Sequence, residues 1–313
     1  TLAAPLWTTM RIFPFPFPWM AVYYPALFMA FLSAGAWRRL GRVVLVALFG
    51  LALLCGLVAP NSTLGSDTGM RITFLDVGQG DAVLLQAPSG ATVLVDGGMK
   101  GPVLAAKLRS RGVRFLDAVV MSHPEADHVG GLGGALDACG VGLLVHPGTQ
   151  GGALAARFLA RAEEMGVAVQ TMHEGDVLRL GEIRMVSLGP PAQIPEDAPA
   201  NEYCLVLRVE GPGFSLLLCG DVEEEGEGFL LRRPEVLPCG ILKVPHHGGF
   251  AQTSGEFFAQ VDPEVAVISV GEDNSYGHPA KDTVDTLERM GCGVYLPRFI
   301  NIVDTPYNLL VKV

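Results

Sequence analysis

The sequence predicts an α/β fold, two β-sheets packed face to face with helices outside, preceded by two transmembrane helices. Short apolar runs typical of strands occur in both halves of residues 70–313, with helical patterns between them, an alternation that favours a layered α/β fold. Before residue 60, two long apolar segments carry no charge. The small polar stretch NSTLGSDTG separates the two parts. We therefore expect a membrane segment at 1–60, a linker at 61–69 and one large domain at 70–313.

The two apolar segments, residues 12–37 and 43–59, are uncharged, and each approaches the roughly 20 residues that a membrane helix needs. Prolines in the FPFPFP opening predict that the first regular helix begins near Trp19. A signal peptide is the alternative, which the second segment disfavours. A chain that opens without Met is expected to continue a longer membrane protein. Three arginines lie between the spans, and the positive-inside rule then predicts an extracytoplasmic domain on a multi-pass cell-membrane protein.

The domain after the linker is strongly acidic. The first 69 residues hold four of the 22 basic and one of the 32 acidic residues, which leaves residues 70–313 near −13. This charge excludes sequence-independent duplex binding through phosphates alone, unless metal ions or a local basic patch supply positive charge. The six cysteines contain no C-x-x-C pair, so they indicate neither a zinc knuckle nor a redox motif.

Each element of the domain follows from local periodicity and turn residues. Strands are predicted where β-branched and apolar residues cluster between turn signals, at 71–77, 81–87, 91–98, 116–122, 142–148, 167–172, 183–189, 203–210, 214–221, 240–247, 264–271 and 293–297. Helices are predicted where the apolar spacing is three to four residues, at 103–111, 223–232, 255–261 and 281–290. The acidic run at 223–227 is interpreted as a solvated helix start.

The stretch MSHPEADHVGGL, residues 121–132, places two of the seven histidines and two acids directly after a strand. His123 and Glu125 are two residues apart and can point the same way in extended backbone, whereas the side chains of Asp127 and His128 can point toward a second ligand position. A solvated acidic loop with incidental histidines is the alternative. Two further strand ends favour a metal site, because Asp221 follows LLLCG and the pair His246–His247 follows LKVP.

Together these motifs resemble the metallo-β-lactamase superfamily. HPEADH is similar to its H-x-H-x-D-H signature, and VLVDGG, LCGD and VPHHGG match its companion motifs. The sequence also resembles the ComEC-type family of DNA-internalisation competence proteins, in which such a domain follows a membrane channel region. The segments that carry this resemblance are FLDVGQGDAVLL, MSHPEADHVGGL, LKVPHHG and NSYGHP. The resemblance implies an αββα metallo-β-lactamase sandwich after the end of that channel region.

The resemblance also implies a set of site residues. The metal ligands would be His123, Glu125, Asp127, His128, Asp221 and one or both of His246 and His247. Asp127, Asp221 and His278 would take part in catalysis. Asp96 would orient a ligand histidine, and the other supporting or substrate-contacting candidates are Asp76, Gln79, Asp81, Asn201, Lys243, Asn274 and Tyr276.

Two of these assignments carry alternatives. His278, in NSYGHP, is either a surface turn residue or a phosphate-contacting or proton-donating group that Asn274 and Tyr276 support by hydrogen bonds. DVGQGD invites comparison with a phosphate-binding loop, but it lacks the G-x-G-x-x-G spacing, which favours a tight turn that places Asp81 near the strand ends. Lys243 and Lys281 are the cations expected to hold phosphate.

The sequence departs from the superfamily pattern at the ligands themselves. Glu125 replaces a histidine, and the usual third motif has no histidine, with Asn201 the nearest candidate. Oxygen ligands harden the site, so we expect two divalent ions with Mn²⁺ preferred and Zn²⁺ second.

The resulting hypothesis is a metal-dependent deoxyribonuclease on the outer face of the membrane, which degrades the strand that is not imported. Its expected partners are DNA, the membrane and other DNA-uptake proteins. Two alternatives stay open: a non-catalytic module that guides DNA into the channel, and a hydrolase of small phosphodiesters, because fold does not fix function.

Overall fold

A computed structural model describes residues 69–149, 151–195, 197–249, 253–272, 274–296, 300–305 and 308–312. The chain divides into two compact units, Thr1–Ser66 and Asp67–Val313, and all described residues belong to the second. Both predicted membrane helices lie outside the described residues. Within the described ranges, no helix is long and apolar enough to cross a bilayer.

The first sheet has eight strands in the order β15-β14-β1-β2-β3-β4-β5-β6. Antiparallel pairs join β15 through β3, and parallel pairs join β3 through β6. The strands are β1 (Arg71–Phe74), β2 (Val83–Gln86), β3 (Thr92–Val95), β4 (Phe115–Val120), β5 (Gly140–His146), β6 (Ala168–Thr171), β14 (Ile300–Thr305) and β15 (Asn308–Lys312).

The second sheet has seven strands in the order β13-β12-β11-β10-β9-β8-β7. It also joins an antiparallel half, β7 through β10, to a parallel half, β10 through β13. The strands are β7 (Val177–Leu180), β8 (Ile183–Gly189), β9 (Val206–Gly211), β10 (Phe214–Leu218), β11 (Ile241–Lys243), β12 (Val265–Val267) and β13 (Gly293–Tyr295). Each sheet therefore has a parallel half, whose strand ends meet at one edge.

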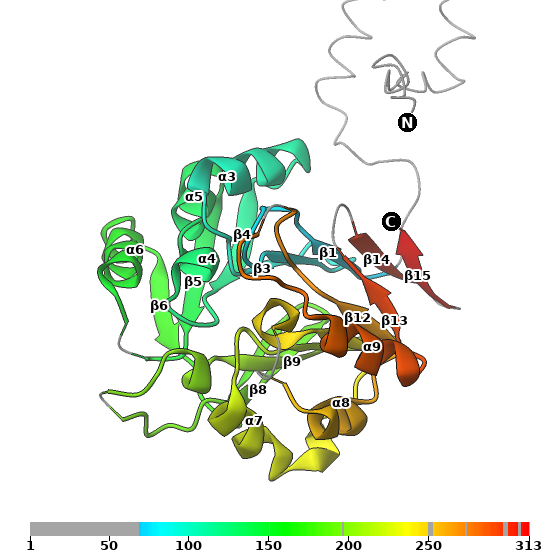
Figure 1. Ribbon diagram of the computed structural model, residues 1–313. Helices are drawn as coiled ribbons and strands as arrows, with labels where there is room; N and C mark the ends of the chain where they lie inside the picture. The colour runs from blue at the N-terminus through cyan, green and yellow to red at the C-terminus, as the bar shows by residue number, and fades with distance from the viewer. Residues whose placement is uncertain are drawn as a thin grey trace, which may run out of the picture. The chain divides into compact units, whose positions relative to one another are not determined.

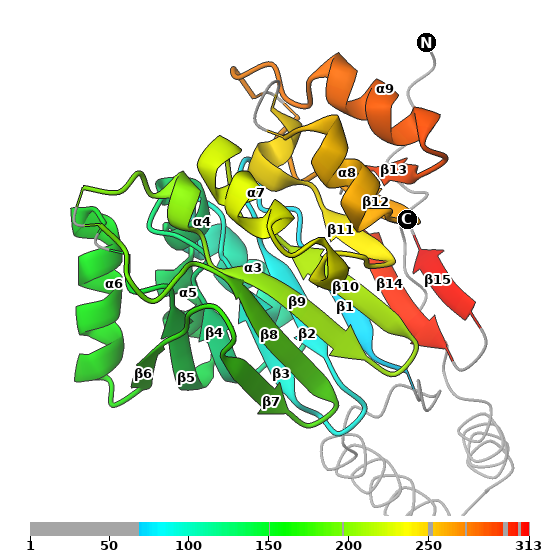
Figure 2. The same cartoon turned by 90° about the horizontal axis from the view of Figure 1, so that it is seen from below.

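Helices cover the outer face of each sheet (Figures 1 and 2). The first sheet carries α3 (Gly101–Ser110), α4 (Ala126–Val129), α5 (Leu132–Ala138) and α6 (Ala153–Glu164), and the second carries α7 (Glu224–Leu231), α8 (Gly255–Val261) and α9 (Lys281–Arg289). Short 3-10 helices η1 (Asn201–Tyr203), η2 (Pro234–Val236) and η3 (Pro245–Gly248) lie in the connections. The predicted sandwich of two sheets between helices is confirmed.

Three apolar clusters hold the four layers together. Leu85 packs between the sheets, together with Leu207 and Ile241, whereas its neighbour Leu84 packs outward under α3 and α5. Successive strand residues point to opposite faces, so strands buried on both faces need continuous apolar runs. A third cluster, including Phe257, fills the space between the second sheet and its helices. The predicted strands overran at their ends, because the terminal polar residues belong to the loops that build the site.

Helix α5 begins in close contact with the loop after β3. The backbone N–H of Gly131 donates to the carbonyl of Gly98 at 2.6 Å, and a Cβ added at Gly131 would overlap the carbonyl oxygen of Gly97. Gly133 lies two residues later, inside α5. The nearest atom to a Cβ added at Gly133 is Arg161 Nη1, at 3.6 Å, an ordinary contact distance. In the glycine run HVGGLGG, the packing therefore requires glycine at 130, 131 and 134 but not at Gly133.

This contrast predicts opposite effects of the same substitution. Gly131→Ala should lower the free energy of unfolding by about 3 kcal/mol, because the backbone of the adjacent loop must move. Gly133→Ala should leave it unchanged or raise it by up to about 1 kcal/mol, because alanine favours helix. Urea denaturation of both variants measures the difference, and equal effects would contradict the packing described here.

Candidate metal centre

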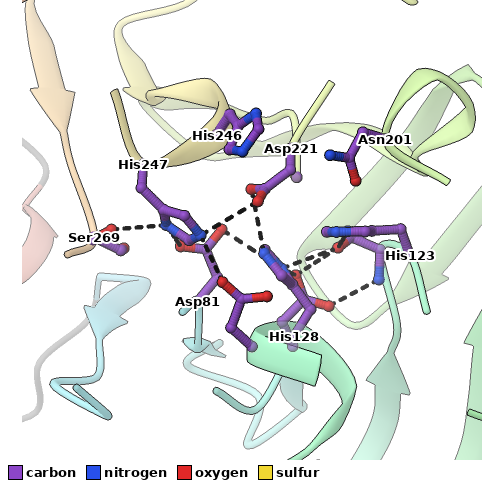
Figure 3. Close-up of polar contacts among 12 residues, drawn as sticks. Asp81, His123, His128, Asn201, Asp221, His246, His247 and Ser269 are labelled. Atoms are coloured by element: carbon purple, nitrogen blue, oxygen red, sulfur yellow. Dashed lines mark hydrogen bonds and ion pairs between the residues drawn. The ribbon is translucent and has the colours of Figure 1, made fainter. Parts of the chain in front are cut away.

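Loops that follow strands of both sheets bring the predicted ligands together (Figure 3). The loop after β4 and helix α4 supply His123, Asp127 and His128, the turn after β10 supplies Asp221, and η3 after β11 supplies His247. Strands β10 and β11 are parallel neighbours, so their carboxyl ends, and the residues that follow them, lie at the same edge of the sheet.

Four side chains converge closely enough to hold one ion. His128 Nε2 lies 3.2 Å from Asp221 Oδ1, and His247 Nε2 lies 3.2 Å from Asp221 Oδ2 and 3.1 Å from Asp127 Oδ2. The donor atoms of these four residues all lie within 4.8 Å of one another. Two imidazole nitrogens and two carboxylates are ordinary ligands of divalent transition metals.

Buried polar atoms without hydrogen-bond partners test whether a metal fits. His123 Nε2, His128 Nε2, Asp221 Oδ1 and Asn201 Oδ1 are all buried and form no hydrogen bond. Buried polar groups normally have a partner, and bound cations are partners that such atoms can have. Figure 3 shows His123 and Asn201 on the same side of Asp221. The donor set therefore fits divalent metal, with His123 and Asn201 extending it beyond the four-residue group.

Neighbouring groups fix the orientation of the candidate ligands. Asp96 accepts hydrogen bonds from the backbone N–H and hydroxyl of Ser122, at 2.8 and 2.7 Å, and its Oδ2 lies 2.9 Å from His128 Nδ1. His247 Nδ1 contacts the carbonyl oxygen of Ser269 at 2.8 Å. Because the Nδ1 atoms of His128 and His247 are engaged behind the rings, their Nε2 atoms face the centre. Ser122 adjoins the motif and could have been inferred, whereas nothing in the sequence points to Ser269.

Glu223 holds two candidates at the rim of the centre. Asn201 Nδ2 donates to Glu223 Oε1 at 2.9 Å, and His246 Nδ1 lies 2.9 Å from the same oxygen. The hydrogen bond assigns the amide nitrogen of Asn201 to Glu223 and leaves its oxygen free. Glu223 precedes α7, and the interpretation of this acidic run as a merely solvated helix start therefore missed its contact with the site.

The structure distinguishes the two adjacent histidines of VPHHGG. Both adopt left-handed backbone, with φ of 45° at His246 and 53° at His247, so their side chains diverge. His247 is buried and joins Asp127 and Asp221, whereas His246 faces Glu223. Glu125 is exposed and lies outside the four-residue group.

Lys243, the last residue of β11, is buried within the centre. Its side chain is 2% exposed, its ammonium forms an ion pair with Asp81, and it lies 3.6 Å from Asp221 Oδ1. It also donates to the carbonyl of Gly220 at 3.2 Å. The expectation that Lys243 holds substrate phosphate was wrong, because its ammonium is enclosed by carboxylates. Lys281 is exposed and pairs with Asp285.

The DVGQGD segment forms a tight turn that joins the two halves of the site. Gly80 has φ of 109°, and an added Cβ there would overlap the carbonyl of Asp127, so the turn needs glycine. Asp81 then donates its backbone N–H to that carbonyl at 3.2 Å. Gln79 Oε1 accepts from the N–H of Gly271 at 3.1 Å, and Asp76 contacts Gly78 and Lys107. The turn positions Asp81, and Gln79 anchors a loop of the second sheet.

A second turn places His278 beside the histidine pair. Asn274 Nδ2 donates to the carbonyl of His278 at 2.8 Å, and Asn274 Oδ1 accepts from the N–H groups of Tyr276 and His278 at 3.2 and 3.1 Å. The His278 ring centroid lies 5.7 Å from that of His246 and 6.4 Å from that of His247. Asn274 supports His278 through the backbone, as a turn clamp.

Charge and burial act in opposite directions on the imidazoles. Burial and the neighbouring His128 lower the pKa of His123 to about 3. Burial also lowers the pKa of His247, but Asp221 and Asp127 outweigh it and raise the value to about 9. Burial raises the pKa of Asp127, yet its bond to His247 brings the value down to about 2. His128, between Asp221 and Asp96, has its pKa raised well above the ordinary value despite burial.

Comparison with known proteins places the chain in a family. Residues 75–272 match the family model described as the metallo-beta-lactamase superfamily, and the chain belongs to this superfamily. A solved structure with the same fold is the metallo-beta-lactamase fold protein YhfI from Bacillus subtilis, with a TM-score of 0.53 and 14% identity over 74% of this chain and 96% of that one. The fold and the donor set together support a metal-dependent hydrolase that uses divalent ions.

Two relatives within the superfamily are named as competence or ComE operon proteins. ComE operon protein 3 of Bacillus subtilis is 33% identical over 70% of this chain and 30% of its own length. Competence protein ComA of Neisseria gonorrhoeae is 30% identical over 74% of this chain and 32% of its own length. The predicted resemblance to ComEC-type competence proteins is confirmed. The chain spans about a third of the length of these relatives.

The enclosed ion pair of Lys243 predicts a large effect on stability. Lys243→Met keeps the length of the side chain but removes the ammonium that pairs with Asp81, so the free energy of unfolding of the metal-free protein should fall by about 3–5 kcal/mol. Lys281→Met removes an exposed pair and should cost about 0.5 kcal/mol or less. Chemical denaturation measures both, and a Lys243→Met variant as stable as Lys281→Met would refute the assigned role.

The raised pKa of His247 predicts that protons and metal compete. With a pKa of about 9 against an ordinary 6.5, His247 is protonated at neutral pH in the metal-free protein, so a metal must displace a proton. Apparent Mn²⁺ affinity should therefore rise about tenfold per pH unit for each displaced proton as pH increases toward 9. Calorimetry in buffers of different ionisation enthalpy detects the released protons, and an affinity independent of pH would contradict the geometry.

The same shift has a consequence for the metal-free fold. Because the folded pKa of His247 is the higher one, its charge contributes stability that is fully present below 6.5 and is lost as pH rises through about 9. Thermal unfolding of the metal-free protein between these values should therefore show falling stability. The His247→Gln variant serves as the control, and it should lack this part of the pH dependence.

Proposed function

We propose that this domain hydrolyses DNA phosphodiester bonds with two divalent ions, on the outer face of the cell membrane, during DNA uptake. The observation that carries the proposal is the joint occurrence of a convergent, buried set of metal donors and of competence proteins among the relatives. Degradation of the strand that is not imported is the role that we infer, with the membrane and other DNA-uptake proteins as partners.

The donor set supports a preference for Mn²⁺ over Zn²⁺. Asp127, Asp221 and the amide oxygen of Asn201 contribute oxygen atoms, which harder cations prefer. When bound, the ions would supply a hydroxide nucleophile near neutral pH and neutralise charge on the phosphate and the leaving oxygen. His123, Asp127, His128, Asp221 and His247 are the residues that would hold them.

The protein groups contribute orientation and proton transfer. Asp221, whose two oxygens contact His128 and His247, would hold the ions together with these two histidines. Asp127 lies at the entrance of the centre and is partly exposed. His278 stands beside the pair His246–His247, and burial together with these two histidines lowers its pKa. A neutral His278 can accept a proton or hydrogen-bond the substrate.

The membrane location and domain division remain part of this proposal. The uncharged segments within 1–60 would anchor the chain as a multi-pass membrane protein, the polar residues 61–69 would link them to the hydrolase domain at 70–313, and the arginines between the segments would lie in the cytoplasm. This orientation leaves the hydrolase domain outside, where incoming DNA arrives.

The proposal predicts a loss of cleavage when a central ligand is removed. Asp127→Asn should reduce Mn²⁺-dependent cleavage of linear and circular DNA by at least about 100-fold, the upper end of the cost of losing a supporting partner. Glu164→Gln, an exposed acid at the end of α6, is the matched control and should retain activity. A His123→Ala, Asp127→Asn double variant that still cleaves DNA would refute the assigned site.

The same assay separates the remaining candidate functions. A generic phosphodiester, bis(p-nitrophenyl) phosphate, is tested beside DNA with Mn²⁺ and with Zn²⁺. Cleavage of the small substrate without DNA cleavage would indicate a small-molecule phosphodiesterase. Binding of DNA without turnover of either substrate would indicate a module that guides DNA into the channel.

A further inference from the structure

Tyr276 is an exposed aromatic side chain beside the candidate metal centre. With 68% of its surface exposed, it is the most exposed large apolar side chain in the described part of the chain. It lies two residues before His278, in the turn between β12 and α9. Single exposed apolar residues are common, so its exposure alone carries no function. Two features distinguish Tyr276 from other exposed apolar residues: the hydrogen bonds that hold its turn and the aromatic rings beside it.

The turn that carries Tyr276 is held at several points. Asn274 accepts from the N–H of Tyr276 and donates to the carbonyls of Gly271 and His278, at 3.1 and 2.8 Å. The turn is also attached to the centre, because Ala280 donates its N–H to the carbonyl of Gly248 at 2.9 Å. A ring on such a turn can bind a flat ligand without first being ordered.

A series of rings leads from Tyr276 to the buried ligands. The Tyr276 ring centroid lies 5.9 Å from that of His278, and the His278 centroid lies 6.4 Å from that of His247, with interplanar angles of 33° and 31°. His247 in turn is 5.5 Å from His128. A planar group stacked on Tyr276 would therefore lie near His278, at the periphery of the centre.

The charge of the domain favours such a surface for a nucleic-acid substrate. The domain is near −13, Lys243 is enclosed by carboxylates, and Lys281 pairs with Asp285. Phosphate contacts, which dominate most nucleic-acid binding, are thus weakly supplied here. Stacking on an aromatic ring contributes about 1–3 kcal/mol per base and does not depend on charge.

We propose that Tyr276, backed by His278, is a stacking platform for an unpaired nucleobase next to the metal centre. This inference rests on the proposed function and names the substrate class more closely, as a single strand or a frayed end. A base inside a duplex is already stacked on both faces, so its ring is not available to Tyr276.

The test compares two fluorescent oligonucleotides of equal length and charge, one of thymidine nucleotides and one with base-free abasic sugars. Anisotropy is measured on the full chain with metal removed by chelation, so that nothing is cleaved. The wild-type protein should bind the base-containing probe about 5- to 150-fold more tightly. Tyr276→Ala should remove this difference, and Tyr276→Phe should keep it.

Two controls separate stacking from general effects. Phe115→Ala removes another exposed ring, 53% exposed at the start of β4 and at the opposite end of that strand from the site, and it should keep the wild-type ratio. The ratio should also stay constant between about 50 and 200 mM salt, because the two probes carry the same phosphates.

Equal binding of both probes by the wild-type protein, or an unchanged ratio in Tyr276→Ala, would overturn the platform. Failure of the proposed function is measured separately, as the absence of Mn²⁺-dependent hydrolysis of DNA and of bis(p-nitrophenyl) phosphate by the wild-type chain. A base-dependent ratio without hydrolysis would support the platform in a binding module.

Discussion

The ion pair between Lys243 and Asp81 is the interaction on which the site depends. Lys243 is the last residue of a strand in the second sheet, and Asp81 lies in a turn of the first sheet. Their contact therefore joins the two sheets at the strand ends that carry the site. Charges that are enclosed in this way carry a large desolvation cost unless they are paired and further hydrogen-bonded. Here the ammonium also reaches Asp221 and the carbonyl of Gly220. The pairing therefore fixes how the two halves of the centre face each other.

Close backbone contacts bring the loops within reach of that pair. Gly80 meets the carbonyl of Asp127, Gly131 meets the loop after β3, and Gly220 packs against Ser122. At each of these positions a side chain would push one loop away from another and would separate ligands that must lie a few ångströms apart. The parallel halves of the two sheets bring the strand ends to one edge, and the glycines let the loops close over it.

Sequence patterns predicted the two-sheet architecture and most of the convergent residues, because both follow from local rules. Apolar runs mark strands that are buried on both faces, and polar residues two or three positions after Val120, Leu218 and Lys243 mark strand ends. The hairpin β14–β15 was not predicted, since its pairing with β1 is a contact between distant parts of the chain. The choice between His246 and His247 depends on left-handed backbone at both positions, and the contacts of Glu223 and Lys243 depend on packing between elements.

The pKa shifts in the centre show how positive charge balances its carboxylates. The centre contains four buried or partly buried carboxylates, Asp81, Asp96, Asp127 and Asp221, and the ammonium of Lys243 pairs with two of them, Asp81 and Asp221. Coulombic attraction raises the pKa of His128 and His247 against the effect of burial, so two imidazolium ions add the missing positive charge. Divalent ions would later replace these protons on the same nitrogens, Nε2 of each ring. A proton and a metal ion would therefore compete for the same imidazoles, which makes metal binding to this centre depend on pH.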